Sequence, residues 1–264
     1  MKFIRFISKY DKPEIGVLQN DGSIETIHGD LLGEYEKTGE TCPPEEITRY
    51  LPPVAPPNIF ALGLNYREHA IETNAEIPTA PLIFIKATTS LTAHRCPIVL
   101  PKPAPQEVDY EAELVIVIGK KTRNIKPEEA AEYIFGYTCG NDVSARDCQK
   151  RLDKQWARAK SFDTFAPTGP VIETELESSN LKIRSILNGE VMQDSTTADL
   201  IFSIPEIVSY FSQNFTLLPG TLIFTGTPPG VGVARTPPRF LQPGDKIEIE
   251  IEGIGRLDNY VQTE

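Results

Sequence analysis

The sequence of 264 residues is poor in the residue types that define several common protein classes. It has four cysteines with no CxxC pair and no dense framework, so we expect reduced, mostly buried thiols rather than disulfides or a thiolate metal site. These are Cys42, Cys96, Cys139 and Cys148. Only three histidines occur, which excludes a zinc site built from three histidine ligands. The glycine-rich stretch FTGTPPGVG at 224–232 has neither the GK[ST] of a phosphate-binding loop nor a GxGxxG turn, so nucleotide binding is not indicated.

Positive charge and long apolar runs are also scarce. The chain has 26 Lys and Arg against 37 Asp and Glu, a net charge of −11, which repels phosphate backbones and anionic membranes. We therefore expect no nucleic acid and no membrane as partners. No run of about 18 apolar residues appears, and the opening MKFIRFISKY alternates like a strand rather than forming a signal core. These features predict a cytoplasmic protein.

What is present predicts a β-rich α/β protein. Three N-terminal strands are expected at 2–7, 14–19 and 23–27, with a turn at Asn20-Asp21-Gly22, and residues 28–50 are polar and weakly patterned. The stiff run PPVAPP at 52–57 indicates a boundary between a small N-terminal β domain, 1–52, and a larger domain, 57–264. Further strands are expected at 58–65, 81–87, 113–120, 169–174, 182–193 (a hairpin about Asn188-Gly189), 221–228 and 246–261. Helices are expected at 67–74, 127–134, 144–158 and 203–213.

The segment DYEAELVIVIGKK at 109–121 combines acids with a buried strand. In a strand, Asp109, Glu111 and Glu113 share one face, and the residues that follow are apolar on both faces. Carboxylates that lead into a core need a cation or hydrogen-bond donors, and two at i and i+2 can reach one hard divalent ion. The alternative is a solvated strand end. Asp142, at the junction between an apolar segment and the helix expected at 144–158, supplies a third oxygen ligand or, alternatively, the N-cap of that helix.

Three further groups have both a chemical and a plain interpretation. His69 and Glu72 are spaced i, i+3, so a carboxylate can orient an imidazole that acts as a general base, or the two form an exposed helical pair. The amides and threonine hydroxyls of the loop at 224–232 can hold a carboxylate, or the loop is a plain turn. Lys160 lies beside aromatic and apolar residues in the sequence. It is either an active-site lysine or a surface lysine whose aliphatic stem is buried.

Six stretches in one order carry a resemblance to a known family. They are GLNYREHAIE, DYEAELVIVIG, GNDVSARDCQ, RAKSFDTFAPTGP, LNGEVMQDSTTADLIFSIPEIVSYFS and PGTLIFTGTPPGVG. Across about residues 57–262 the chain resembles the fumarylacetoacetate hydrolase family. The resemblance implies a mixed β-sandwich roll, a homodimer and a bound Mg²⁺ or Mn²⁺.

The resemblance also implies roles for particular residues. The metal ligands of the family fall on Glu111, Glu113 and Asp142. Its histidine–glutamate pair falls on His69 and Glu72, and its active-site lysine on Lys160. Its substrate-binding residues fall on Arg146, Gln149 and Thr227.

The implied substrate is a small 2-oxo acid, whose negative charge the acidic chain would repel without a cation in the site. The resemblance favours a hydrolase that cleaves a C–C bond in a 3-acylpyruvate to release pyruvate. The alternatives are an oxaloacetate decarboxylase or tautomerase, and a hydroxyheptadienedioate isomerase or decarboxylase. A non-catalytic metabolite-binding protein on the same fold is disfavoured because His69, Glu72 and Lys160 are all present.

Overall fold

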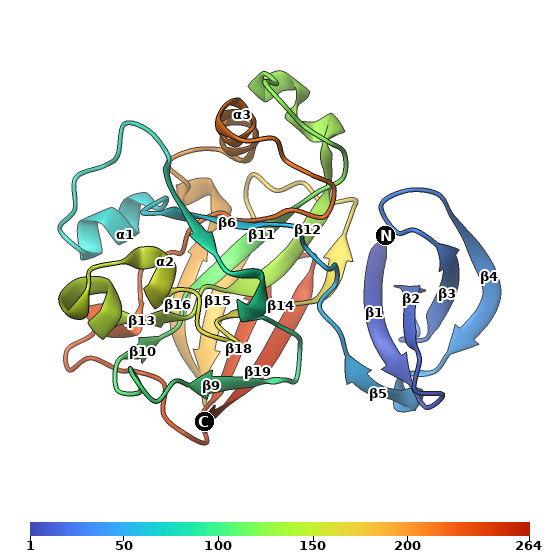
Figure 1. Cartoon of the computed structure of the whole chain (residues 1–264), viewed down its shortest axis with the longest axis horizontal. Coiled ribbons are helices and arrows are strands. Elements are labelled where there is room, and N and C mark those ends of the chain that lie inside the picture. Colours follow the sequence, from blue (N-terminus) through green and yellow to red (C-terminus); the bar gives the residue numbers. More distant parts are fainter.

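The computed structural model describes residues 1–264 and consists mainly of strands (Figure 1). The N-terminal strands are β1 (Lys2–Ser8), β2 (Pro13–Leu18), β3 (Ile24–Gly29), β4 (Tyr35–Cys42) and β5 (Ile47–Tyr50). The first three confirm the sequence prediction. The sequence analysis did not predict β4 and β5. Most side chains of β4 are exposed on both faces, so no alternation of buried and exposed residues marks this strand.

These strands form one end of a large mixed sheet. Its order is β4-β3-β2-β1-β14-β12-β11-β17-β6-β7, and β1 joins β14 with Phe3 opposite Ile172. The other members are β6 (Ile59–Gly63), β7 (Leu82–Lys86), β11 (Ala112–Ile118), β12 (Ile134–Asn141), β14 (Ala166–Glu173) and β17 (Leu222–Phe224). Strands β6 and β17 are parallel, whereas most other pairs are antiparallel. The short strand β8 (Leu91–Thr92) pairs with β14.

A second sheet packs against the first. It has the order β16-β15-β18-β19-β9, and β18 and β19 contact β12 and β14 of the large sheet. Its strands are β9 (Pro97–Leu100), β15 (Lys182–Leu187), β16 (Glu190–Thr196), β18 (Lys246–Ile251) and β19 (Gly255–Thr263). The turn at Asn188-Gly189 joins β15 and β16, as the sequence predicts. The chain therefore folds as a mixed β-sandwich roll.

Strand β11 separates two hydrophobic clusters, as its alternation predicts. Leu114, Ile116 and Ile118 belong to the larger cluster, whereas Val115 and Val117 belong to the smaller one. All five side chains are inaccessible to solvent, so β11 runs through the centre of the protein. Any polar group at its start is therefore at the edge of the core.

The helices are short and lie around the sheets. They are α1 (Arg67–Glu72), α2 (Trp156–Ala159), α3 (Ile204–Asn214), and the 3₁₀ turns Pro44–Glu46, Thr88–Ser90, Pro127–Glu132, Thr197–Asp199 and Gly232–Ala234. The longest, α3, begins at a capping box between Ser203 and Glu206. No helix combines the length and apolar character needed to span a membrane. The four cysteines are free thiols, and three of them are buried.

The predicted helix at 144–158 is wrong. The chain instead forms the short strand β13 (Ser144–Ala145), paired with β10 (Val108–Asp109), then a π-helical turn at Cys148–Leu152, and then α2. Lys154 has a φ of 53°, which interrupts any continuous helix. Pairing with β10 and burial of Arg146 and Gln149 outweigh the local helical preference of this segment.

Candidate metal centre and active site

Three carboxylates meet where β11 begins and β12 ends. Strand pairing places Glu113 opposite Gly140, so Glu111 and Glu113 lie beside Asp142, which directly follows β12. One oxygen from each of the three carboxylates lies within 4.8 Å of the others. Glu113 and Asp142 are fully buried and Glu111 is 6% exposed, so the alternative of a solvated strand end is wrong. Asp142 is not a helix N-cap either, because β13 follows it.

The loop after β17 supports Glu113 from the other side of β11. Thr225 donates its hydroxyl to the Leu114 carbonyl at 2.9 Å, and the Gly226 amide donates to Glu113 Oε2 at 2.7 Å. Gly226 has a φ of 101°, and a Cβ there would lie 2.7 Å from Asn65 Cβ, so a glycine is required for this approach. The other oxygen, Glu113 Oε1, is buried without a hydrogen-bond partner.

Three cations surround the carboxylates. Lys160 Nζ lies 2.7 Å from Glu111 Oε2 and 2.5 Å from Asp142 Oδ2, and Lys86 donates to Asp142 Oδ1. Arg146 Nη2 lies 2.7 Å from Glu111 Oε1 and 2.8 Å from Asp109 Oδ2. Lys160 is 2% exposed, so the alternative of a surface lysine is wrong.

The charges of this cluster are unbalanced. With all seven groups ionised, Asp109, Glu111, Glu113 and Asp142 contribute four negative charges against the three positive charges of Lys86, Arg146 and Lys160, which leaves a formal charge of −1. A divalent cation would change this to +1, a favourable environment for an anionic ligand.

The pKa values of the two glutamates diverge for identifiable reasons. Burial opposes ionisation of Glu111, but Lys160 and Arg146 outweigh it and hold its pKa at about 2. Burial raises the pKa of Glu113 well above its ordinary value, and the charges of Asp142 and Glu111 raise it further. Glu113 is thus a buried acid with an unsatisfied oxygen that points to a missing positive partner. An all-oxygen set of this kind fits a hard divalent cation.

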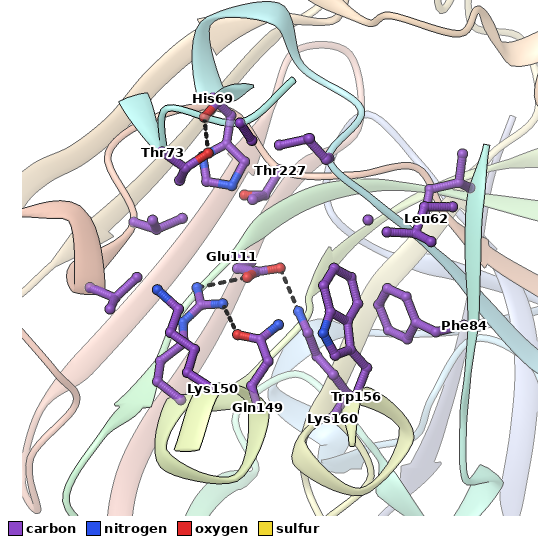
Figure 2. A pocket seen from close by; sticks show the side chains of 17 residues that line it. Leu62, His69, Thr73, Phe84, Glu111, Gln149, Lys150, Trp156, Lys160 and Thr227 are labelled. Carbon is purple, nitrogen blue, oxygen red and sulfur yellow. Dashed lines mark hydrogen bonds and ion pairs between the residues drawn. The ribbon is translucent and has the colours of Figure 1, made fainter. Parts of the chain in front are cut away.

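Helix α1 brings the histidine–glutamate pair to the same site. His69 Nδ1 lies 3.0 Å from Glu72 Oε2, and Glu72 Oε1 accepts a 2.8 Å hydrogen bond from the Gly230 amide. The two side chains are 12% and 21% exposed, on a short helix that lies at the surface. Figure 2 shows the His69 ring extending toward Glu111 from the opposite side of the pocket.

A cavity of about 320 Å³ lies between these groups. Six predicted site residues line it: His69, Glu111, Arg146, Gln149, Lys160 and Thr227. Glu72 lies behind His69, and Glu113 and Asp142 lie deeper in the protein. Within the lining, Gln149 Oε1 accepts from Arg146 Nη1 at 2.9 Å. The Thr227 hydroxyl donates a hydrogen bond to the Ala112 carbonyl at 3.0 Å and accepts one from Gln193 Nε2 at 2.8 Å. This hydroxyl is therefore already hydrogen-bonded within the chain.

Several residues of the site escaped the sequence analysis. Lys86 ends a strand that is otherwise apolar, and nothing in its local pattern distinguishes it from an ordinary strand end. Asp109 was expected on one face with Glu111 and Glu113 but was given no role, and the structure shows that it accepts hydrogen bonds from Arg146, Gly232 and Val233. Apolar residues form one wall of the cavity: Leu62, Leu82, Phe84 and Trp156.

Comparison with known proteins identifies the family. Residues 58–262 match the family described as fumarylacetoacetate (FAA) hydrolase C-terminal, and residues 1–53 match a family described as Rv2993c-like, N-terminal. The mitochondrial oxaloacetate tautomerase FAHD2A of Homo sapiens is 44% identical over 223 residues, which cover 83% of this chain and 71% of that protein.

Solved structures are similar over the whole chain. A 5-carboxymethyl-2-hydroxymuconate delta-isomerase from Mycobacterium smegmatis is 39% identical with a TM-score of 0.90, covering 100% of both chains. A 2-hydroxyhepta-2,4-diene-1,7-dioate isomerase from Mycobacterium marinum is 38% identical with a TM-score of 0.88, covering 100% of this chain and 99% of the other. The protein described here belongs to the fumarylacetoacetate hydrolase family.

Proposed function

We propose that the protein is a metal-dependent enzyme that interconverts the keto and enol forms of a small 2-oxo acid, with oxaloacetate as the best-fitting compound. The observation that carries this proposal is a buried group of three carboxylates, one of which, Glu111, lines the same small cavity as an oriented histidine. The similarity to oxaloacetate tautomerases at 42–44% identity supports the choice of substrate.

The metal ligands in this proposal are Glu111, Glu113 and Asp142. Oxygen donors without sulfur or imidazole favour Mg²⁺ or Mn²⁺ over zinc. Such a cation supplies Lewis acidity, which lowers the energy of negative charge on the 2-oxo oxygen of a substrate. The unpartnered Oε1 of Glu113 supports a ligand at this position.

Cationic and amide groups of the chain bind and orient the substrate. Burial lowers the pKa of Lys160, but Asp142 and Glu111 outweigh burial and raise it, so this lysine stays charged beside the cavity. Gln149 uses its oxygen to accept from Arg146, which leaves its amide hydrogens available to a substrate oxygen. Both groups can therefore hold a carboxylate or oxo group against the metal site.

His69 moves the proton. The hydrogen bond between Nδ1 and Glu72 leaves Nε2 free, and Gly230 fixes Glu72 in turn. In the keto form, Nε2 takes a proton from the carbon next to the oxo group. His69 then transfers this proton to the oxo oxygen, which gives the enol. The same two steps in reverse give the ketone.

A second candidate reaction uses the same groups. If His69 takes its proton from a water molecule rather than from substrate carbon, that water can attack the 4-oxo carbon of an acylpyruvate. The bond between C3 and C4 then breaks, the acyl group leaves as a carboxylic acid, and the enolate of pyruvate takes the proton back from His69. The observation that favours this reaction is the His69–Glu72 pair itself, which has the arrangement of a general base and its orienting acid. The geometry of the chain is compatible with both reactions, and the assay below distinguishes them.

The test compares chelator-treated protein with the same protein reloaded with Mg²⁺ or Mn²⁺. Loss of the enol absorbance of oxaloacetate measures tautomerisation, and coupled reduction of pyruvate measures cleavage of acetylpyruvate. We expect metal-dependent tautomerisation of oxaloacetate. Equal activity of metal-free protein, verified by elemental analysis, contradicts the proposal, whereas metal-dependent pyruvate release without tautomerisation favours the second candidate.

A further inference from the structure

Lys150 is an unpaired cation in the candidate active site. It follows Gln149 in the π-helical turn and lines the same cavity as His69 and Glu111. Its neighbour Arg151 lies 2.7 Å from Glu107, and Lys160 is paired with two carboxylates. Lys150 has no hydrogen bond or ion pair with any residue, and its side chain is exposed at the mouth of the cavity.

The surroundings of Lys150 favour an anion from outside the chain. Burial lowers the pKa of Lys150, and the nearby charge of Arg146 lowers it further. Asp109 and Glu111 are already paired with Arg146, and Glu107 is paired with Arg151, so these carboxylates are not free counter-ions for Lys150. In a chain with 37 acidic residues, a lysine that faces a cavity without an acidic partner is available for an anionic ligand.

The opposite wall of the cavity is occupied by packed aromatic rings. Trp156 lies so close to the backbone that a Cβ on Gly63 would be 2.4 Å from its Cζ3. Phe84 meets Trp156 edge-on with ring centroids 5.6 Å apart, and Lys160 Nζ lies 5.3 Å from the Phe84 ring centroid. Figure 2 shows Lys150 and Gln149 on one side of Glu111 and these rings on the other. The cavity is therefore cationic on one side and apolar on the other.

We infer that Lys150 binds a second carboxylate of the substrate, so that the site prefers dicarboxylic 2-oxo acids to acylpyruvates, which have a single carboxylate. This inference rests on the proposed function. The first carboxylate and the oxo group occupy the region of Glu111, Lys160 and Gln149, and the second carboxylate extends toward the mouth of the cavity. Lys150 thus selects the substrate and takes no part in proton transfer.

Two substrates of nearly equal shape test the role of Lys150. Oxaloacetate and acetylpyruvate differ in having a carboxylate or an acetyl group at the same position, and the enol absorbance follows both. In Lys150→Met, kcat/KM for oxaloacetate should fall about 10- to 100-fold, the usual worth of a hydrogen bond to a charged group. The value for acetylpyruvate should stay within about twofold, because that substrate has no second charge for Lys150 to bind. Lys154→Met, a change of an exposed lysine outside this cavity, is the matched control and should alter neither value.

Binding gives a second readout that does not depend on turnover. Trp156 is the only tryptophan of the chain and lines the cavity, so its fluorescence reports the Kd of each compound. Selectively weaker binding of oxaloacetate to Lys150→Met supports the inference even if the wild type converts neither compound. In that case only the proposed function fails. An unchanged ratio of the two Kd values, or an equal loss for both substrates, overturns the role of Lys150. Acetylpyruvate turnover by an active wild type at a higher kcat/KM than oxaloacetate overturns it as well.

Discussion

Replacing Glu113 with glutamine should change stability and metal binding in opposite directions. In metal-free protein, Glu113 is fully buried beside Glu111 and Asp142, and one of its oxygens has no hydrogen-bond partner. A glutamine of the same shape keeps an acceptor for the Gly226 amide and offers a donor to a neighbouring carboxylate. It also removes an ionisable group whose charged form is disfavoured in the metal-free cluster.

The raised pKa of Glu113 fixes the direction of the change in stability. Burial and the neighbouring carboxylates favour the protonated form in the folded state, whereas the unfolded chain is ionised at neutral pH. Because the folded pKa exceeds the unfolded one, metal-free wild type loses stability as the pH rises above the unfolded pKa. We expect Glu113→Gln to be more stable than wild type at pH 7 without metal by about 1–3 kcal/mol, the usual cost of a buried polar atom without a partner, or roughly 3–10 °C in Tm for a chain of this size.

Added metal should reverse this order. A cation at one hundred times its Kd stabilises the folded wild type by about 2.7 kcal/mol, and the variant, which lacks one ligand charge, should gain far less. The assay is thermal unfolding of both proteins with chelator and with excess Mn²⁺, and Glu190→Gln, on an exposed position of β16, is the matched control. The reasoning is refuted if the variant is less stable than wild type in chelator, or if Mn²⁺ stabilises both equally.

Three further predictions concern the groups around the metal site and the N-terminal strands. Asp109→Asn should lower the free energy of unfolding by about 2–4 kcal/mol and raise KM, because it breaks a buried pair that positions Arg146; a loss below about 1 kcal/mol in denaturant unfolding contradicts this. His69→Ala should lower kcat about 10²- to 10⁴-fold and Glu72→Gln should do so less, with unchanged metal content by elemental analysis; an unchanged kcat would leave α1 with a structural role only. Burial lowers the pKa of His94 to about 4, so its contribution to stability is complete above an ordinary histidine pKa of 6.5 and is lost as the pH falls toward 4, by at most about 3 kcal/mol. In His94→Gln, pH-dependent unfolding should lack this loss, and a parallel loss in both proteins contradicts the assignment.

Much of the fold could be predicted from local pattern. The alternation of β11, the Asn188-Gly189 turn and the helix expected at 203–213 depend only on neighbours in the chain, and the structure confirms all three. The segment at 144–158 could not be predicted this way, because its helical preference yields to pairing with β10 and to burial of Arg146. The exposed strand β4 carries no pattern at all.

The candidate site, like the fold, could be predicted from the sequence only in part. The acidic spacing of Glu111 and Glu113 marks a possible cation site, but sequence alone left a solvated strand end open. Burial of these residues depends on which strands pair with β11, and that order places β12 on one side and β17 on the other. Lys86 joins the site from β7 at the far edge of the sheet, and no signal near it in the chain records that contact.

The sequence by itself determined the periodicity of the strands, the residue types available for chemistry and, through its ordered motifs, the family. Only the tertiary structure decided which charges share the site: Glu72 meets an amide 158 residues away, and Lys150 faces the cavity without a partner. The physical reason is that local propensities act over a few residues, whereas the energy of a buried charge depends on every group that packs around it.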